Sequence, residues 1–192
     1  MRYLSMDIEA TGLHQDSLMI EFGMVPFDAE KKIICEEFSR SYYIKCPSFN
    51  QLAPKLDDWV KDNMKNVIDK AHNQGIEISE FKQSLTQYLE SNEIKKFFNH
   101  EKICLFGKSV NAIDLPFLSR DLGWDYMRKY FSHRVLDLSA VVYAMVDMKK
   151  LPKEAISGSE LMKYLNMGEV AHTALEDARN TALIYIEILK RF

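Results

Sequence analysis

The sequence has few cysteines, no excess of positive charge and no long apolar run. Its three cysteines, Cys35, Cys46 and Cys104, are too few and too unevenly spaced for a disulfide framework or a C-x-x-C zinc site. This cysteine usage fits a reducing compartment. The longest apolar stretches, 103–106 and 140–146, fall far short of the roughly 18 to 20 residues that span a bilayer.

The N-terminal residues lack the pattern of an export signal, because no basic segment followed by an apolar one precedes the acidic Asp7. We therefore expect a cytoplasmic protein with no membrane partner. A formal charge of −3 at pH 7 gives none of the basic excess that proteins use to neutralise nucleic-acid phosphates. Taken alone, the net charge argues against a nucleic-acid partner.

The composition is that of an ordinary globular protein. Of the 192 residues, 47% are apolar, 11% aromatic and 28% charged, which excludes a disordered chain, a collagen-like chain and a coiled coil. The length predicts a single domain over residues 1–192, and a chain of this size buries roughly 70% of its unfolded surface. No internal repeat or low-complexity tract divides it.

The hydrophobic pattern predicts strands first and helices later. Apolar runs bounded by turn residues predict strands at 3–8, 19–27, 33–44 and 103–106. Helical spacing of apolar residues predicts helices over 52–68, 78–98, 112–122, 137–147, 158–165 and 175–190. This order predicts an α/β fold with a mixed sheet, which starts with three antiparallel strands, adds the buried strand 103–106 beside the first, and is covered by helices.

Two carboxylates lie at the end of the first predicted strand. Asp7 and Glu9 are two residues apart, so their side chains point to the same side of the sheet, and paired anionic oxygens suit Mg²⁺ or Mn²⁺. A D-x-E pair is also expected about once by chance in a chain with 28 acidic residues. The functional interpretation gains weight from Ala10, Thr11 and Gly12, a small residue, a hydroxyl and a glycine that let a ligand approach the backbone.

Further acidic and histidine residues occur at two later positions. Asp114 follows the predicted strand at 103–106, although it or Asn111 could simply cap the helix that starts here. His172 and Asp177 form an H-x₄-D pattern, with Asp177 on the last predicted helix and His172 in the loop before it. A loop histidine is usually only a surface residue, but beside a carboxylate it is the group that a water-activating general base requires.

Together, the D-x-E pair, the later Asp and the H-x₄-D pattern resemble the DEDDh 3′-5′ exonucleases. This ribonuclease-H-like group includes proofreading exonuclease subunits, ribonuclease T and oligoribonuclease. The resemblance covers residues 3–190, and Thr11-Gly12, the Leu-Pro-Phe-Leu after Asp114 and the segment 135–137 agree with it. It implies a ribonuclease-H-like fold that hydrolyses phosphodiester bonds at the 3′ end of single-stranded RNA or DNA and releases nucleoside 5′-monophosphates.

The resemblance also implies roles for the five motif residues. Asp7, Glu9 and Asp177 would hold one of two Mg²⁺ or Mn²⁺ ions together with the attacking water. Asp7 and the scissile phosphate would hold the second ion, supported by Asp114. His172 would accept the proton of the attacking water. Two such cations stabilise both the entering and the leaving oxygen of an in-line displacement.

Two shorter stretches, 56–59 and 130–139, are similar to oligoribonuclease in particular. The wider family often forms homodimers, so we expect a homodimer here. The sequence departs from oligoribonuclease at His133, where those enzymes carry a tyrosine that reaches the partner's site. It also has one residue more between Gly107 and Asp114. Both departures bear on the preference for dinucleotides.

Candidate substrate-binding residues come from several parts of the chain. Backbone groups of Ala10 and Thr11 would approach the terminal nucleotide, and Leu13 would pack against its base. Trp59 either stacks on a base or is a core-facing aromatic of its helix. Asn111 is a further candidate. A possible cationic surface for a single strand, whose alternative is a solvated helix end, comprises Lys108, Arg128, Lys129, His133 and Arg134, with Tyr126, Tyr130 and Phe131 interleaved.

Two other functions remain open from the residues. The run from Asp7 to Gly12 also resembles the D-x-D-x-T-G of aspartyl-phosphate phosphatases, although that motif needs Asp at the position of Glu9. The second alternative is a non-catalytic module that binds single strands on the same fold. The sequence does not separate RNA from DNA as the substrate, because the contact to a 2′-hydroxyl is a matter of geometry.

Overall fold

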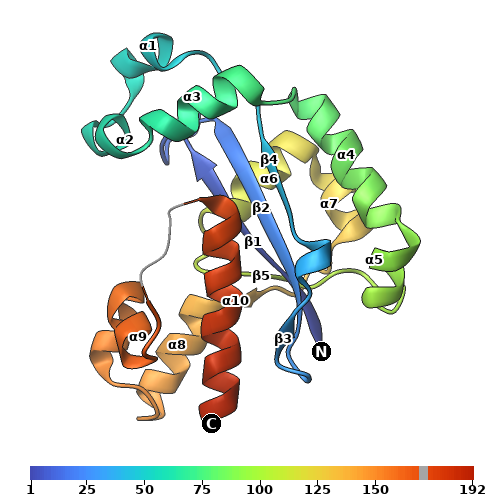
Figure 1. Ribbon diagram of the computed structural model, residues 1–192, viewed down its shortest axis with the longest axis vertical. Helices are drawn as coiled ribbons and strands as arrows, with labels where there is room; N and C mark the ends of the chain where they lie inside the picture. The colour runs from blue at the N-terminus through green and yellow to red at the C-terminus, as the bar shows by residue number, and fades with distance from the viewer. Residues whose placement is uncertain (169–172) are drawn as a thin grey trace.

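The computed structural model describes residues 1–168 and 173–192, and it consists of a twisted sheet with helices on both faces (Figure 1). The strands are β1 (Arg2–Ala10), β2 (Met19–Asp28), β3 (Ile33–Ile34), β4 (Arg40–Tyr43), β5 (Leu105–Gly107) and β6 (Leu136–Asp137). The helices are α1 (Phe49–Leu52), α2 (Asp58–Asn63), α3 (Lys65–Gln74), α4 (Ile78–Glu90), α5 (Asn92–Phe97), α6 (Asp114–Leu122), α7 (Trp124–Tyr130), α8 (Leu138–Asp147), α9 (Gly158–Tyr164) and α10 (Ala174–Arg191). Short 3₁₀ turns occur at Glu36–Phe38, Ala53–Lys55 and Lys153–Ile156.

The sheet has the order β3-β2-β1-β5-β6, and β4 also pairs with β2. β2 runs antiparallel to β1, β3 and β4, whereas β5 and β6 are parallel to β1 and to each other. The predicted mixed sheet with an antiparallel start is therefore confirmed. Because parallel strands end at the same edge, residues at the end of β1 and just after β5 lie close together.

Alternation along β1 divides the core into two faces. Leu4, Met6 and Ile8 pack into the cluster that also contains residues of α4 and α6, whereas Tyr3 packs into the cluster formed with α8 and α10. Asp7 and Glu9 share the face of Tyr3 because residues two apart in a strand point the same way. A third, smaller cluster lies beneath α2 and α3.

The structure corrects the predicted boundaries at three places. The predicted strand 33–44 is interrupted by the 3₁₀ turn after β3, and the predicted helix over 52–68 is divided into α1, a 3₁₀ turn, α2 and α3. The predicted helix 78–98 ends at Glu90, because Ser91 is extended and its side chain caps α5 by accepting a hydrogen bond from the Ile94 N–H in the first turn of that helix. β6 and α7 were not predicted, and β6 is too short for a periodic pattern.

Among the described helices, none combines the length and the apolar character that crossing a membrane would require.

Candidate active site

The site begins with two side chains of β1 that face α10. Further back on the same face of β1, the Ser5 hydroxyl donates a hydrogen bond of 2.6 Å to the carbonyl oxygen of Ala178 in α10. Asp7 and Glu9 follow on this face, opposite Gly23 and Glu21 of β2. The strand therefore presents both carboxylates to the first turns of α10.

The start of α10 lies directly on the sheet because Gly23 has no side chain. A Cβ atom at Gly23 would come within 2.3 Å of the backbone of both Ala174 and Leu175. Ala174, Ala178 and Ala182 are fully buried along the contact face of the helix. This close approach brings Asp177 to β1.

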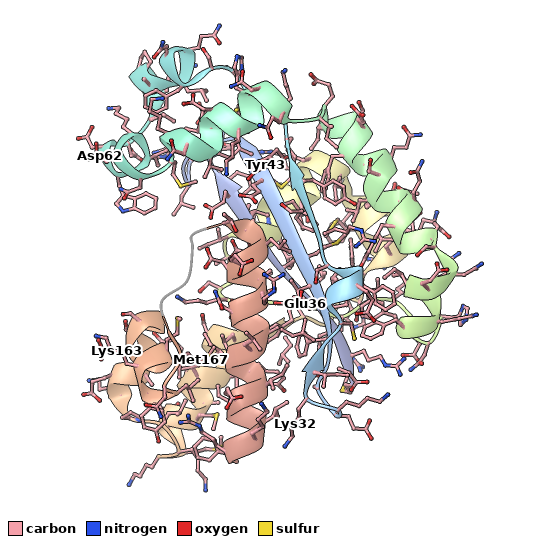
Figure 2. The ribbon with its side chains drawn as sticks, in the orientation of Figure 1. Lys32, Glu36, Tyr43, Asp62, Lys163 and Met167 are labelled. Atoms are coloured by element: carbon pink, nitrogen blue, oxygen red, sulfur yellow. The ribbon has the colours of Figure 1, made fainter. Side chains whose placement is uncertain are left out.

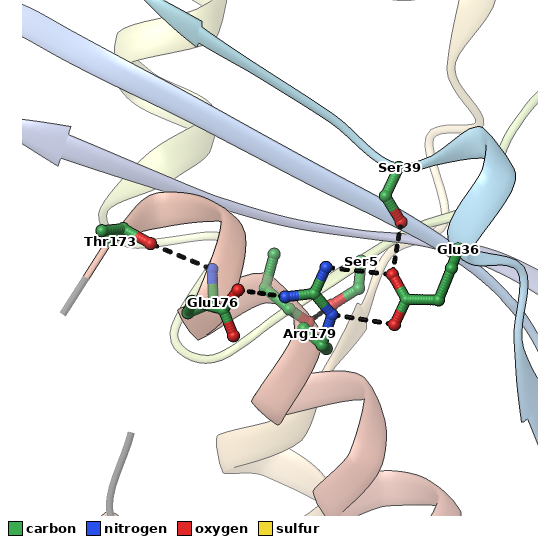
Figure 3. Close-up of polar contacts among 7 residues, drawn as sticks. Ser5, Glu36, Ser39, Thr173, Glu176 and Arg179 are labelled. Atoms are coloured by element: carbon green, nitrogen blue, oxygen red, sulfur yellow. Dashed lines mark hydrogen bonds and ion pairs between the residues drawn. The ribbon is translucent and has the colours of Figure 1, made fainter. Parts of the chain in front are cut away.

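Polar contacts at its start also hold α10 (Figure 3). The Thr173 hydroxyl caps the helix by accepting a hydrogen bond from the Glu176 N–H at 3.3 Å. Arg179 donates two hydrogen bonds of 2.9 Å to the two carboxylate oxygens of Glu36, beside β3, and also pairs with Glu176. These bonds connect α10 to the antiparallel side of the sheet.

The result is a compact carboxylate group formed by Asp7, Glu9 and Asp177. One oxygen from each of the three lies within 4.8 Å of the other two. Hard anionic oxygens at this spacing are the ligands that Mg²⁺ and Mn²⁺ prefer. The donor set therefore fits the divalent cations that the resemblance implies.

Asp114 lies beside this group as the first residue of α6. Its side chain is 3% exposed and accepts a hydrogen bond of 3.0 Å from the backbone N–H of Ile8, between Asp7 and Glu9. It therefore contacts the strand of the carboxylate group directly. The alternative that Asp114 only caps its helix is incomplete, because the side chain reaches across to β1.

The carboxylates raise each other's pKa values. Burial first, and then the charges of Asp114, Glu9 and Asp177, raise the pKa of Asp7 well above its usual value. Burial and repulsion by Asp177 and Glu21 raise the pKa of Glu9 to about 7. Burial raises the pKa of Asp114 to about 7 although the bond from Ile8 opposes this. Bound cations would offset this repulsion and allow the group to ionise.

Glu21 is a further buried carboxylate that the sequence reasoning missed. It is 2% exposed, lies opposite Glu9, and accepts a hydrogen bond of 3.2 Å from the Ser41 hydroxyl. Its Oε2 atom has no hydrogen-bond partner among the described residues, and burial raises its pKa. The available signal was a single acid inside the apolar run of β2, which a buried strand rarely contains without a reason.

The structure places Ala10, Thr11 and Leu13 at or just beyond the end of β1. Ala10 is half-buried and ends the strand. Thr11 is buried, and it closes the loop to β2: its N–H donates to the Leu18 carbonyl at 2.9 Å and its hydroxyl accepts from the Leu18 N–H at 2.8 Å. The Thr11 N–H is thus bonded within the loop, and the approach of Ala10 and Thr11 backbone groups to a terminal nucleotide stays a prediction. Leu13 is 73% exposed at the tip.

Trp59 lies on α2 and is 67% exposed, which contradicts the alternative that it faces the core. The loop that carries Leu13 contacts the start of α2, because the His14 Nε2 atom lies 3.3 Å from an Asp57 carboxylate oxygen. Leu13 and Trp59 are therefore exposed apolar side chains on two neighbouring segments.

The remaining candidates do not join the carboxylate group in the described structure. Asn111 is exposed in the turn before α6. His133 and Arg134 are exposed and precede β6, so they lie at the amino ends of the parallel strands, whereas Asp7 and Glu9 lie toward the carboxyl end of β1. His172 lies outside the described residues.

A cavity of about 680 Å³ extends from the carboxylate group between α8, α9 and α10. Asp7 and Asp177 line one part of it. Its α9 side includes Lys163 and Met167, whose side chains are labelled in Figure 2. The site is thus an open depression with room beside the carboxylates.

Comparison with known families identifies the proteins that this sequence resembles. The model of the family RNase_T, described as exonuclease, matches residues 4–185. The chain belongs to the RNase_T exonuclease family. This match confirms that the protein is an exonuclease, whereas the DEDDh type, the 3′-5′ direction and the finer likeness to oligoribonuclease stay predictions. No curated protein matches the sequence.

Solved structures share the fold of this RNase_T-family exonuclease. The nuclease domain of 3′hExo, a DEDDh family member bound to rAMP, matches with a TM-score of 0.71 and 15% identity, over 99% of this chain and 92% of that one. The RNase domain of yeast Pop2 matches with a TM-score of 0.68 and 15% identity, over 98% and 77% of the two chains. E. coli exonuclease I in complex with a dT13 oligonucleotide matches with a TM-score of 0.66 and 15% identity, over 98% and 41%. These likenesses confirm the ribonuclease-H-like fold class.

Proposed function

We propose that this exonuclease uses divalent metal ions to remove nucleotides from the 3′ end of short single-stranded RNA or DNA and releases nucleoside 5′-monophosphates. The convergence of the Asp7, Glu9 and Asp177 oxygens within 4.8 Å carries this proposal. The relatives bound to rAMP and to a dT13 oligonucleotide support a substrate of this class.

Four carboxylates would hold the ions. Asp7, Glu9 and Asp177 would bind one Mg²⁺ or Mn²⁺, and Asp7 with support from Asp114 would bind the second. When bound, the cations supply Lewis-acid stabilisation of the charge that develops on the phosphate oxygens. The bond from the Ile8 N–H fixes Asp114 in position for this role.

Other residues of the chain would bind the nucleotide and move the proton. Leu13 and Trp59 are exposed on neighbouring segments, where they would stack on the terminal base. His172 would take the proton from the attacking water. Neither of the alternative functions gains support, because a phosphatase needs Asp where Glu9 stands and a pure binding module needs no clustered carboxylates.

The substitution Asp7→Asn tests the proposal. We expect it to abolish Mg²⁺- or Mn²⁺-dependent release of mononucleotides from 5′-labelled oligomers, because Asp7 belongs to both metal positions. Asp125→Asn, which changes an exposed acid of α7, is the matched control and should leave the rate unchanged. Undiminished release by the Asp7 variant would refute the proposal.

The quaternary structure and the location are further predictions. We infer a homodimer from the family resemblance, and sedimentation equilibrium of the purified protein would test it. A cytoplasmic location likewise remains a prediction, which fractionation of the source cells would test.

A further inference from the structure

Lys108 is a cationic side chain beside the carboxylate group that the proposed mechanism does not use. It directly follows β5, which pairs in parallel with β1 through Ser5 and Phe106. Lys108 lines the same cavity as Asp7 and Asp177. The fold therefore brings the ammonium group of Lys108 to the cavity where the proposed function places a phosphodiester.

The backbone on both sides of Lys108 is fixed by specific contacts. A Cβ at Gly107 would lie 3.0 Å from the carbonyl oxygen of Met6, so glycine permits the close approach of β5 to β1. Ser109 has a left-handed φ of 56°, which is uncommon for a residue with a side chain. Its N–H donates to Asp137 at 3.0 Å and its hydroxyl lies 3.0 Å from that of Ser139. These bonds hold the strained turn in place.

The ammonium group of Lys108 is available for a ligand. Within residues 1–168 and 173–192 it forms no hydrogen bond and no ion pair. Its Nζ atom lies against α9, where a Cβ at Gly158 would be only 2.5 Å away. Glycine is a poor helix former, yet at the first position of α9 it leaves space for this ammonium.

The end of the strand determines which phosphate Lys108 can reach. At a 3′ end the scissile phosphate is the last one, so every other phosphate of the substrate lies on its 5′ side. The cations held by the carboxylate group would bind the scissile phosphate. The Nζ atom of Lys108 lies against Gly158 of α9, on the α9 side of the cavity that Asp7 and Asp177 line from β1 and α10.

We propose that Lys108 binds the phosphate immediately 5′ of the scissile phosphate. This inference rests on the proposed function and adds a binding position for the second phosphate of the strand. A compact ammonium suits a single phosphate as a point charge. The contact would give short strands an electrostatic attraction that the net charge of the protein does not provide.

Substrate length provides the test. A dinucleotide without terminal phosphates contains only the scissile phosphate, whereas a trinucleotide contains the next one as well. We expect Lys108→Gln to lower the ratio of kcat/KM for the trinucleotide to kcat/KM for the dinucleotide about tenfold, mainly through KM, because one charge-assisted contact is lost. Lys108→Arg should keep most of the ratio. Lys96→Gln, an exposed lysine of α5, is the matched control.

An equal loss on both substrates would overturn the inference in favour of a contact with the scissile phosphate, and no loss on either would show a solvated lysine. Binding of a labelled trinucleotide in Ca²⁺, followed by fluorescence anisotropy against salt, separates this inference from the proposed function. We expect the slope of log Kd against log salt to fall by about 0.7 in Lys108→Gln. If the wild type binds with this Lys108 dependence but releases no mononucleotide in Mg²⁺ or Mn²⁺, the proposed function fails, and Lys108 is left as a contact to a strand phosphate without a role in cleavage.

Discussion

At the residue scale, the carboxylates at the end of β1 have a folded-state pKa above the value of the unfolded chain. The pKa of Glu9 and that of Asp114 both rise to about 7, and that of Asp7 rises well above its usual value. Without cations, the folded protein therefore binds protons between about pH 4 and pH 7 that the unfolded chain releases. A site with this property is less stable when it is ionised and empty than when a cation neutralises it.

The first prediction concerns pH and metal. Because the folded state binds more protons than the unfolded state across this window, the free energy of unfolding in EDTA should fall as the pH rises from about 4 to about 7, by at least about 2 kcal/mol. Mn²⁺ at pH 7.5 should recover it, since the ions bind only the folded form. Urea unfolding across this pH range measures both effects. A metal-free stability that is constant from pH 4 to 7 would contradict the pKa assignments.

A second residue-scale prediction concerns Trp59. Its side chain is 67% exposed, so Trp59→Ala should change the free energy of unfolding by less than about 0.5 kcal/mol. Loss of base stacking should raise KM about tenfold. Trp124→Ala on α7 is a matched control, because Trp124 is 65% exposed. Steady-state kinetics of the two variants should separate them, and equal KM values would remove Trp59 from the site.

At the element scale, the position of α10 decides whether the site exists. The helix provides Asp177, and it approaches β1 and β2 closely because small residues face each other, Gly23 on the strand and Ala174 and Ala178 on the helix. The Arg179 pair with Glu36 adds little by comparison, because partly exposed ion pairs contribute about 1 kcal/mol or less. Packing of backbone on backbone therefore sets the distance from Asp177 to Asp7.

The third prediction follows from this packing. Gly23→Ala would place a methyl group 2.3 Å from the backbone of α10, so the helix start must move. We expect the free energy of unfolding to fall by about 1 to 3 kcal/mol and the affinity for Mn²⁺ to fall as well. Gly168→Ala is the control, because no atom of the described residues lies within 4 Å of a Cβ there. Denaturant unfolding and calorimetric Mn²⁺ titration measure the two effects, and a wild-type Mn²⁺ affinity in Gly23→Ala would show that α10 does not set the site.

At the scale of the whole molecule, charge is distributed unevenly around a small net value. The formal charge is −3, yet five of the acids lie at or beside the carboxylate group. Several candidate cationic residues, from Arg128 to Arg134, lie instead toward the amino ends of the parallel strands. The chain therefore offers little general electrostatic attraction for a long strand beyond its site.

The fourth prediction concerns substrate length. With 5′-labelled RNA and DNA oligomers of two to twenty nucleotides, we expect the rate per 3′ end to be highest on short single strands. The enzyme should remove one nucleotide at a time from long oligomers and dissociate from them frequently, and the rate should fall as the salt concentration rises. Product ladders under single-hit conditions measure this. Processive digestion of twenty-nucleotide strands would contradict it, and the ratio of RNA to DNA rates would identify the sugar preference.

Much of the fold was predictable because its signals are local. The apolar runs of β1, β2 and β5 and the helical spacing of α4, α6, α8 and α10 appear in short windows of sequence. The breaks were less predictable. Ser91 interrupts a continuous helical pattern because it adopts an extended backbone and caps the next helix, and either conformation is compatible with the apolar pattern.

For the site, the sequence alone determined which acidic and histidine residues are candidates and in which order they occur along the chain. It could do so because D-x-E and H-x₄-D are short-range patterns tied to strand and helix geometry. Only the tertiary structure decided that Asp7, Glu9 and Asp177 meet, that Glu21 is buried beside them, and that His133 and Arg134 lie elsewhere. The reason is physical. Whether these carboxylates come together depends on how closely α10 approaches the sheet and on which ends of the parallel strands lie side by side. Both arise from contacts between residues far apart in the chain.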